Sequence, residues 1–269
     1  MELTQKKGIN AFQLKLLALI IMTIDHIHYF GSSLWNVPEI LTLIGRIAAP
    51  IFVFMLANGF GYTHSRGKYL LRLYIGATLM QLGNIVMNRL FPLQNNVIVM
   101  NGIFSTMALI VFYLICIEGL RGAARMRQYG RMALCILGIL APIALSFALL
   151  PLLSAAPLAA NALMIFVPLP LICEGGPLFV VLGIGFYYCR KSKLATGVFY
   201  TLYCIITLLL IGLTPENIQY IFFMWLSLPF ILLYNGEKGR SMKYLFYIYY
   251  PAHVYILAIA ASLLGSALA

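Results

Sequence analysis

Long apolar runs with few charged interruptions recur along almost the whole chain, and they restrict its fold more than any other feature. The first run contains LKLLALIIMTI (residues 14–24), in which apolar and polar positions do not alternate. The strands of a membrane β-barrel require that alternation, so the runs predict helices. A helix that crosses a bilayer needs ~20 residues, so 269 residues with short loops allow roughly eight to ten crossings.

Composition excludes several classes of protein. Charged residues make up 9% of the chain, whereas a soluble domain carries about a quarter. A water-soluble enzyme, a disordered chain and a nucleic-acid-binding domain are therefore excluded, and we expect no nucleic acid partner. The five cysteines form no Cys-x-x-Cys pair and lie beside no metal-like histidine cluster, so we interpret them as packing residues and expect no metal.

The distribution of lysine and arginine over the loops predicts how the chain crosses the membrane. Nine apolar runs lie at residues 11–30, 39–61, 69–90, 100–120, 132–151, 175–189, 194–213, 218–234 and 244–266. Five basic clusters lie between them: Lys6/Lys7, Arg66/Lys68/Arg72, Arg121/Arg125/Arg127/Arg131, Arg190/Lys191/Lys193 and Lys238/Arg240/Lys243. If the N-terminus is cytoplasmic and each run crosses once, every basic cluster lies in the cytoplasm, as the positive-inside rule requires. The net charge of +11 is then explained by topology alone.

These runs predict an all-α, polytopic membrane helical bundle of about nine spans, with eight to eleven possible, in a single domain over residues 1–269. The first run is too long for a signal-peptide core and contains Asp25, so we expect it to be a span. Residues 151–177 hold five prolines, which interrupt helices. We expect this segment to be outer or re-entrant, packed against protein so that its backbone groups find partners. The sequence allows a homo-oligomer without indicating one.

Several ionisable side chains fall inside the predicted spans, where each costs at least ~2.5 kcal/mol even on lenient insertion scales. Asp25, His26 and His28 lie near the outer end of the first span, and Arg46 lies at a similar depth in the second. We predict that Asp25 and Arg46 form a bidentate ion pair, which is either purely structural or part of a site. His28 lies three residues from Asp25 and can contact it.

Helical geometry relates Lys15 to the same cluster. Lys15 precedes His26 by eleven residues, which places both side chains on one face within ~20°, at a rise of ~16 Å. Lys15 then lies near the cytoplasmic end, where it either extends to the headgroups or belongs to a site. His253 in the last span and Glu174 at the start of the sixth are further candidates, with helix packing an equal alternative for His253.

Three segments resemble the TraX family, whose namesake is a conjugal-transfer inner-membrane protein that acetylates the N-terminus of pilin. They are LKLLALIIMTIDHIHYFG (14–31), IGRIAAPIFVFMLANGFGYTHSRGKYLLRL (44–73) and YLFYIYYPAHVYIL (244–257), and the middle of the chain matches only in hydropathy. The family is similar to a wider group of transmembrane acyltransferases, which share an Arg, ten residues and a His in the first span. Here Lys15 stands in place of that Arg, so the cation is kept and the planar fork is lost.

The resemblance implies a multi-pass acyltransferase of the bacterial cytoplasmic membrane that takes acetyl groups from cytoplasmic acetyl-CoA. The acceptor on the outer side would be the N-terminal amine of a membrane peptide such as pilin, or a glycan hydroxyl or amine. His26 would be the general base, because histidine titrates near working pH. Asp25 and Arg46 would hold the site in shape, or Arg46 would stabilise the oxyanion. Lys15, Arg66, Lys68 and Arg72 are candidates for binding the CoA phosphates.

Two other classes of function compete with this interpretation. A proton-coupled small-solute transporter also uses buried groups such as Asp25, His26 and Arg46. Transporters often contain internal repeats, and we find none in this sequence. A non-catalytic membrane scaffold would leave unexplained why charged groups gather at one depth. Consumption of acetyl-CoA distinguishes the first interpretation from the other two.

Overall fold

The computed structural model describes residues 7–241 and 243–268, and within them the secondary structure consists of twelve α-helices. The helices are α1 (Ala11–Gly31), α2 (Ile40–Gly45), α3 (Ala48–Tyr62), α4 (Arg66–Leu90), α5 (Ile103–Arg125), α6 (Tyr129–Ala155), α7 (Pro157–Phe166), α8 (Gly176–Cys189), α9 (Lys193–Ile211), α10 (Pro215–Trp225), α11 (Ser227–Leu233) and α12 (Lys243–Leu268). This confirms the all-α prediction. Lys6 and the side chain of Lys243, members of two basic clusters, lie outside the described residues.

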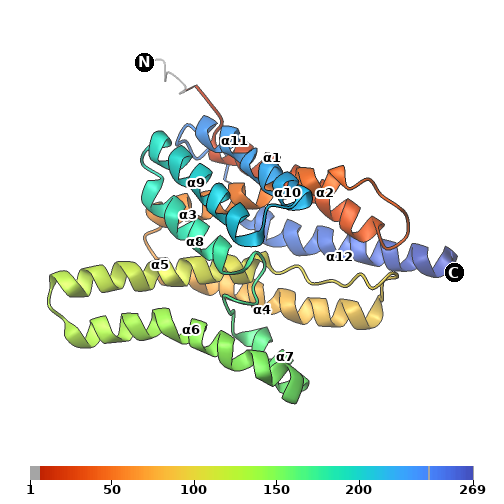
Figure 1. Cartoon of the computed structure of the whole chain (residues 1–269), viewed down its shortest axis with the longest axis horizontal. Coiled ribbons are helices and arrows are strands. Elements are labelled where there is room, and N and C mark those ends of the chain that lie inside the picture. The colour runs from red at the N-terminus through yellow and green to blue at the C-terminus, as the bar shows by residue number, and fades with distance from the viewer. Residues whose placement is uncertain (1–6, 242, 269) are drawn as a thin grey trace. The chain divides into compact units, whose positions relative to one another are not determined.

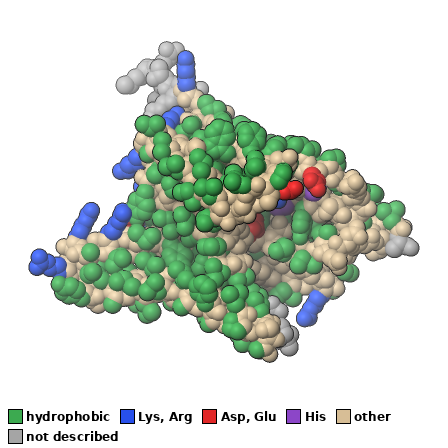
Figure 2. Space-filling view, in the orientation of Figure 1, with side chains coloured by type: hydrophobic (Ala, Val, Ile, Leu, Met, Phe, Trp, Pro, Cys, Tyr) green, Lys and Arg blue, Asp and Glu red, His purple; other side chains and the backbone are tan. Residues whose placement is uncertain are grey.

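Within the part of the chain that the structure describes, eight stretches of helix are long and apolar enough to cross a membrane. They are α1, α2 with α3, α4, α5, α6, α9, α10 with α11, and α12, while α8 is a shorter apolar helix of 14 residues. Figure 2 shows hydrophobic side chains over most of the face that it presents, with lysine and arginine in a few projecting places. The prediction of a polytopic membrane protein is therefore confirmed.

The first and last helices, α1 and α12, lie side by side and run in the same direction (Figure 1). At the start of α1, the Ala11 N–H donates to the carbonyl of Glu237, which shortly precedes α12, at 2.8 Å. At the other end, the side chains of Gln94 and Asn95 in one loop donate to the carbonyls of Gly265 and Ser33. Two crossings in the same direction require an odd total, so the prediction of nine spans needs one crossing besides these eight, for which the 14-residue α8 is the candidate. Which side is cytoplasmic stays a prediction.

A capping box starts α1 and so sets the register of the helix that carries the candidate site. The Asn10 side chain accepts from the Gln13 N–H, and the Gln13 side chain accepts from the Asn10 N–H, both at 3.0 Å. This reciprocal pair satisfies two backbone donors that the first turn leaves open. The helix then continues without interruption to Gly31.

Contacts between residues divide the chain into two compact units. Unit 1 consists of Met1–Met55, Val86–Val99 and Tyr188–Ala269, and unit 2 consists of Leu56–Ile85 and Met100–Tyr187. The single domain over residues 1–269 stays a prediction. Unit 1 contains α1, α2 and α9 to α12, and it therefore holds the histidines of both the first and the last span.

Unit 2 contains an antiparallel hairpin of two long helices, α5 and α6 (Figure 1). Two of the five cysteines pack against glycines across this hairpin, since Cβ atoms built on Gly119 and Gly138 would lie 3.0 Å from Cys135 Sγ and Cys116 Sγ. All five cysteines are free thiols. Their contacts agree with a packing role for this pair.

The proline-rich segment is more helical than its prolines suggest. Pro151 lies inside α6, which continues to Ala155, and Pro177 lies in the first turn of α8. Residues 167–175 connect α7 to α8, and Leu169 in this stretch packs with Leu149 and Ala160 in a buried cluster. Burial in the same stretch raises the pKa of the Cys173 thiol. Among the described side chains of residues 151–177, only Ala160, Leu169 and Pro170 are buried, so the packing of the whole segment against protein stays a prediction.

Candidate functional site

A buried pair of histidines joins α1 to α12 within unit 1. The His26 Nδ1 atom lies 2.6 Å from the His253 Nε2 atom, and the two rings stack with centroids 4.8 Å apart at 20°. Only 6% of His26 and 7% of His253 is exposed. The sequence placed both residues in spans, and the structure shows that they bind each other across 227 positions of the chain.

Tyr249 and Thr23 continue this contact along the same two helices. The His253 Nδ1 atom lies 2.8 Å from the Tyr249 carbonyl oxygen, and the Tyr249 ring stacks on the His253 ring with centroids 4.9 Å apart. The Tyr249 hydroxyl lies 2.7 Å from the Thr23 hydroxyl, which donates to the Leu19 carbonyl at 2.8 Å. We call the five residues that these bonds join the α1–α12 seam: Leu19, Thr23, His26, Tyr249 and His253. Thr23 and His26 are three apart and Tyr249 and His253 four apart, so each pair shares one helix face.

Lys15 lies on the same side of α1 as the seam. Its Nζ atom lies 5.2 Å from the centroid of the Phe246 ring on α12. Lys15 and His26 therefore both face α12, as their spacing predicts. The contact with an aromatic face gives the Lys15 cation a partner inside the protein.

The predicted bidentate pair between Asp25 and Arg46 is wrong for the described structure, which shows no ion pair between them within 4.0 Å. The Asp25 side chain lies directly against Gly45, where an added Cβ would be 2.6 Å from Asp25 Oδ1. The Arg46 guanidinium instead lies over the Tyr220 ring of α10, 4.7 Å from its centroid, and its buried Nε atom has no hydrogen-bond partner. Arg46 is the C-cap residue of α2, and Tyr220 belongs to α10. The two charges still interact electrostatically.

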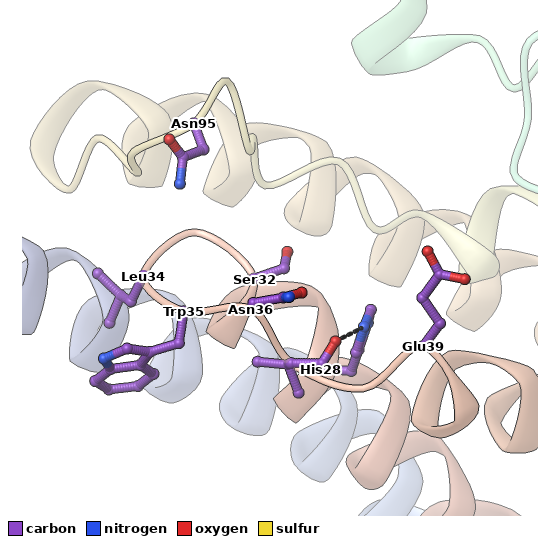
Figure 3. A pocket seen from close by; sticks show the side chains of 8 residues that line it. His28, Ser32, Leu34, Trp35, Asn36, Glu39 and Asn95 are labelled. Carbon is purple, nitrogen blue, oxygen red and sulfur yellow. Dashed lines mark hydrogen bonds between the residues drawn. The ribbon is translucent and has the colours of Figure 1, made fainter.

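His28 faces the loop between α1 and α2 rather than α12. Its Nε2 atom lies 3.2 Å from the Val37 carbonyl, and its Nδ1 atom lies 2.6 Å from the Thr42 hydroxyl. Since a carbonyl only accepts, His28 Nε2 donates to the Val37 carbonyl. His28 also lines a pocket of about 430 Å³, whose other lining residues are Ser32, Leu34, Trp35, Asn36, Val37, Glu39 and Asn95 (Figure 3).

The remaining predicted site residues belong to unit 2. Arg66, Lys68 and Arg72 lie at the start of α4, where the first turn has no acidic residue. The Arg66 guanidinium lies over the Phe60 ring, 4.7 Å from its centroid, and Arg72 Nε is buried with no hydrogen-bond partner. Among the described residues, no ion pair joins Arg66, Lys68 or Arg72 to a carboxylate. A helix start also favours anions.

Glu174 has a structural contact in the same unit. Its carboxylate accepts from the Gly102 N–H at 2.7 Å, and its carbonyl accepts from the Thr106 hydroxyl. Gly102 is the residue that precedes α5, so Glu174 satisfies a backbone donor at the start of that helix. Among residues 7–241 and 243–268, no group of three or more His, Cys, Asp or Glu side chains is placed to hold a metal ion.

Sequence reasoning missed Thr23 and Tyr249, because both resemble ordinary members of an apolar run. The structure places His253 beside His26, whereas the sequence indicated His253 only as a separate candidate in the last span. One signal in the sequence was the spacing of these residues: Thr23 lies three positions before His26, and Tyr249 lies four before His253, so each pair shares a helix face. It could be used only if α1 and α12 were already known to be neighbours.

The spans and the seam define a multi-pass, all-helical membrane protein that keeps a polar cluster within apolar helices. A family model described as TraX protein matches residues 11–261, so the chain belongs to the TraX family. The chain is also similar to a probable fimbrial assembly protein, FimC of serogroup H1, from Dichelobacter nodosus. The two are 27% identical over 269 residues, which cover 93% of this chain and 95% of that protein. No solved structure matches the chain significantly.

Proposed function

We propose that this protein is a membrane-embedded acetyltransferase of the bacterial cytoplasmic membrane, with His26 as the general base. The observation that carries the proposal is the buried contact between His26 and His253 at 2.6 Å. Burying two imidazoles costs free energy that apolar side chains at the same positions would not, so packing alone gives no reason for them. Membership of the TraX family supports the choice of acetyl transfer.

The reaction requires one proton acceptor on the acceptor side of a thioester. His26 would take the proton from an acceptor amine or hydroxyl as the nucleophile attacks the acetyl carbonyl carbon. The new N–C or O–C bond forms, the C–S bond breaks, and His26 returns the proton to the CoA thiolate. The Arg46 guanidinium, whose Nε atom is buried without a partner, is a candidate for stabilising the oxyanion between these steps.

Acetyl-CoA would be bound as the donor substrate from the cytoplasmic side. Arg66, Lys68 and Arg72, which no ion pair joins to a carboxylate in the described structure, would bind its phosphates. Lys15 would contribute a further cation along the path to His26, three helical turns away. The relative named as a fimbrial assembly protein makes a pilin-like membrane peptide the first acceptor to test, with a glycan hydroxyl or amine as the second.

The first test is acetyl-CoA-dependent thermal stabilisation of the purified protein in detergent, followed by transfer of radiolabelled acetyl to a peptide or glycan acceptor. A ligand that binds only the folded state at 100 times its Kd adds ~2.7 kcal/mol of stability, which a melting shift detects. We expect His26→Ala to keep the shift and lose the transfer. Retained transfer in that variant overturns the general-base role, and no shift with folded protein overturns the acetyl-CoA site.

The pocket beside His28 provides a direct assay for acceptor binding. The chain has two tryptophans, and Trp35 lines the pocket while Trp225 ends α10. In a Trp225→Phe variant the fluorescence reports Trp35 alone. We expect an acceptor peptide to change this emission more than its already acetylated form does. Equal responses from both forms would contradict acceptor recognition in this pocket.

The hydrogen bonds of the seam also bear on the competing hypothesis of a proton-coupled transporter. A proton relay needs a group at each step that can release the proton it receives. From His26 the hydrogen bonds lead to His253 and then to the Tyr249 carbonyl, which cannot pass a proton onward. The seam therefore supports a local base better than a route across the membrane.

A further inference from the structure

The α1–α12 seam contains two hydrogen-bond chains, and each ends at a backbone carbonyl, which fixes its direction. A carbonyl only accepts, so the Thr23 hydroxyl donates to the Leu19 carbonyl and its oxygen must accept from the Tyr249 hydroxyl. The same rule places the hydrogen of His253 on Nδ1, which faces the Tyr249 carbonyl at 2.8 Å.

The position of the hydrogen on His253 also decides which atom donates in the hydrogen bond to His26. A neutral imidazole with its hydrogen on Nδ1 carries a lone pair on Nε2. His253 Nε2 is the atom that faces His26 Nδ1 at 2.6 Å, so His26 Nδ1 must donate. His26 then carries its own lone pair on Nε2, the nitrogen that can take a proton.

We infer that His253, oriented by the Tyr249 carbonyl, sets the tautomer of His26 and thereby makes its Nε2 atom the base, while the Tyr249 hydroxyl and Thr23 position the two helices. This inference rests on the proposed function for the identity of the base. It replaces the carboxylate of a serine-protease-type triad by a neutral imidazole, which is itself oriented by a helix carbonyl. No charge is buried, which suits a site inside apolar helices better than a carboxylate does.

Each member of the seam has a separable part in this arrangement. His253 supplies the acceptor, and the Tyr249 carbonyl fixes which nitrogen of His253 accepts. The Tyr249 hydroxyl binds Thr23 on the other helix at 2.7 Å, so it holds the two helices in register three residues before His26. The stacked rings of Tyr249, His253 and His26 limit rotation of the imidazoles about their side-chain bonds.

The experiment is nitrogen NMR of the histidine rings in the full-length protein labelled at its histidines. The chain has four histidines, His26, His28, His64 and His253, so each ring is assigned by the signals that one substitution removes. We expect wild-type His26 to carry hydrogen on Nδ1 and a lone pair on Nε2. The exposed His64 provides the control, because His64→Gln should leave the other three rings unchanged.

Two substitutions at His253 separate positioning from packing. His253→Phe keeps an aromatic ring and removes the acceptor, so His26 should populate both tautomers and kcat should fall, with the KM for acetyl-CoA unchanged. A wrong tautomer in a protease triad costs about 10⁴-fold in kcat, and we expect a loss of about 10²- to 10⁴-fold. His253→Gln offers a carbonyl to His26 Nδ1 and should restore the tautomer and part of kcat.

The outcomes distinguish this inference from the proposed function. Hydrogen on Nε2 of wild-type His26 overturns the inference, whatever the activity, as does a His253→Phe variant with unchanged kcat. The expected tautomer in a protein that binds no acetyl-CoA and transfers no acetyl group overturns the proposed function, and the seam then orients His26 for another purpose. Tyr249→Phe tests the mechanism where His253→Phe fails to fold, because it keeps the carbonyl and removes only the bond to Thr23; its His26 should keep the wild-type tautomer.

Discussion

His26 and His28 are two residues apart on one helix, yet they belong to different regions of the molecule. His26 is 6% exposed and binds a side chain on α12, at the far end of the chain. His28 binds the Val37 carbonyl and Thr42, nine and fourteen positions away, and it lines an open pocket. Two positions on a helix differ by about 200°, which sends the side chains toward different neighbours. Residue type and depth alone therefore do not identify a catalytic histidine, because the neighbouring helix decides its chemistry.

The strongest test of this contrast compares His26→Ala with the wild type. General base catalysis contributes about 10²- to 10⁴-fold, so we expect kcat for acetyl transfer to fall by at least that factor. Binding of acetyl-CoA, read from the melting shift, should stay within twofold. If His28→Ala lost as much activity as His26→Ala, the division between the two histidines would be refuted.

A second test displaces the part of α1 that carries both histidines. Gly45→Ala places a Cβ 2.6 Å from Asp25 Oδ1, and such overpacking typically costs ~1–3 kcal/mol. We expect a lower denaturation midpoint in detergent and reduced transfer. Gly67→Ala is the matched control, because nothing lies within 4 Å of a Cβ at Gly67. Equal stability of the two variants would show that Asp25 moves aside without cost.

A third test concerns stability at the pocket. His28→Ala removes two hydrogen bonds, each worth ~0.5–1.5 kcal/mol, so the free energy of unfolding should fall by ~1–3 kcal/mol. Because His28 does not contact the seam, the KM for the acceptor should rise while kcat changes little. Thr42→Val, which removes one of the two bonds, should have about half the effect on stability. A fall in kcat with unchanged KM would move His28 into the chemistry.

The smallest expected effect is the coupling between Asp25 and Arg46. Since no ion pair joins them within 4.0 Å, we expect the double-mutant cycle of Asp25→Asn and Arg46→Lys to give an interaction energy below ~1 kcal/mol. The measurement is the unfolding midpoint of the four proteins in one detergent. A coupling above ~2 kcal/mol would restore the direct pair that their depth predicts.

Much of the fold follows from the sequence, because hydrophobic length and loop charge report on spans one at a time. The exceptions are local, as at Pro151, where α6 continues through a residue that usually ends a helix. The sequence also predicted the depth of side chains in the membrane, and on that basis Asp25, His26 and Arg46 were unusual as ionisable groups inside spans. The contact partners of these residues could not be predicted, because the partners depend on which spans pack together and on the direction of each side chain. Thus Arg46 turns to Tyr220 and Asp25 to Gly45, although both lie at one depth.

The contact between α1 and α12 has a consequence for the synthesis and membrane insertion of the protein. His26 and His253 are 227 positions apart, so the ribosome must add that many residues after His26 before the two side chains can meet. At about 5–20 residues per second, His26 waits roughly 10–45 s inside the translocon or the lipid without its partner. A product truncated before α12 would insert most of its spans and still lack an assembled centre. Helix α12 thus completes the contact that α1 begins.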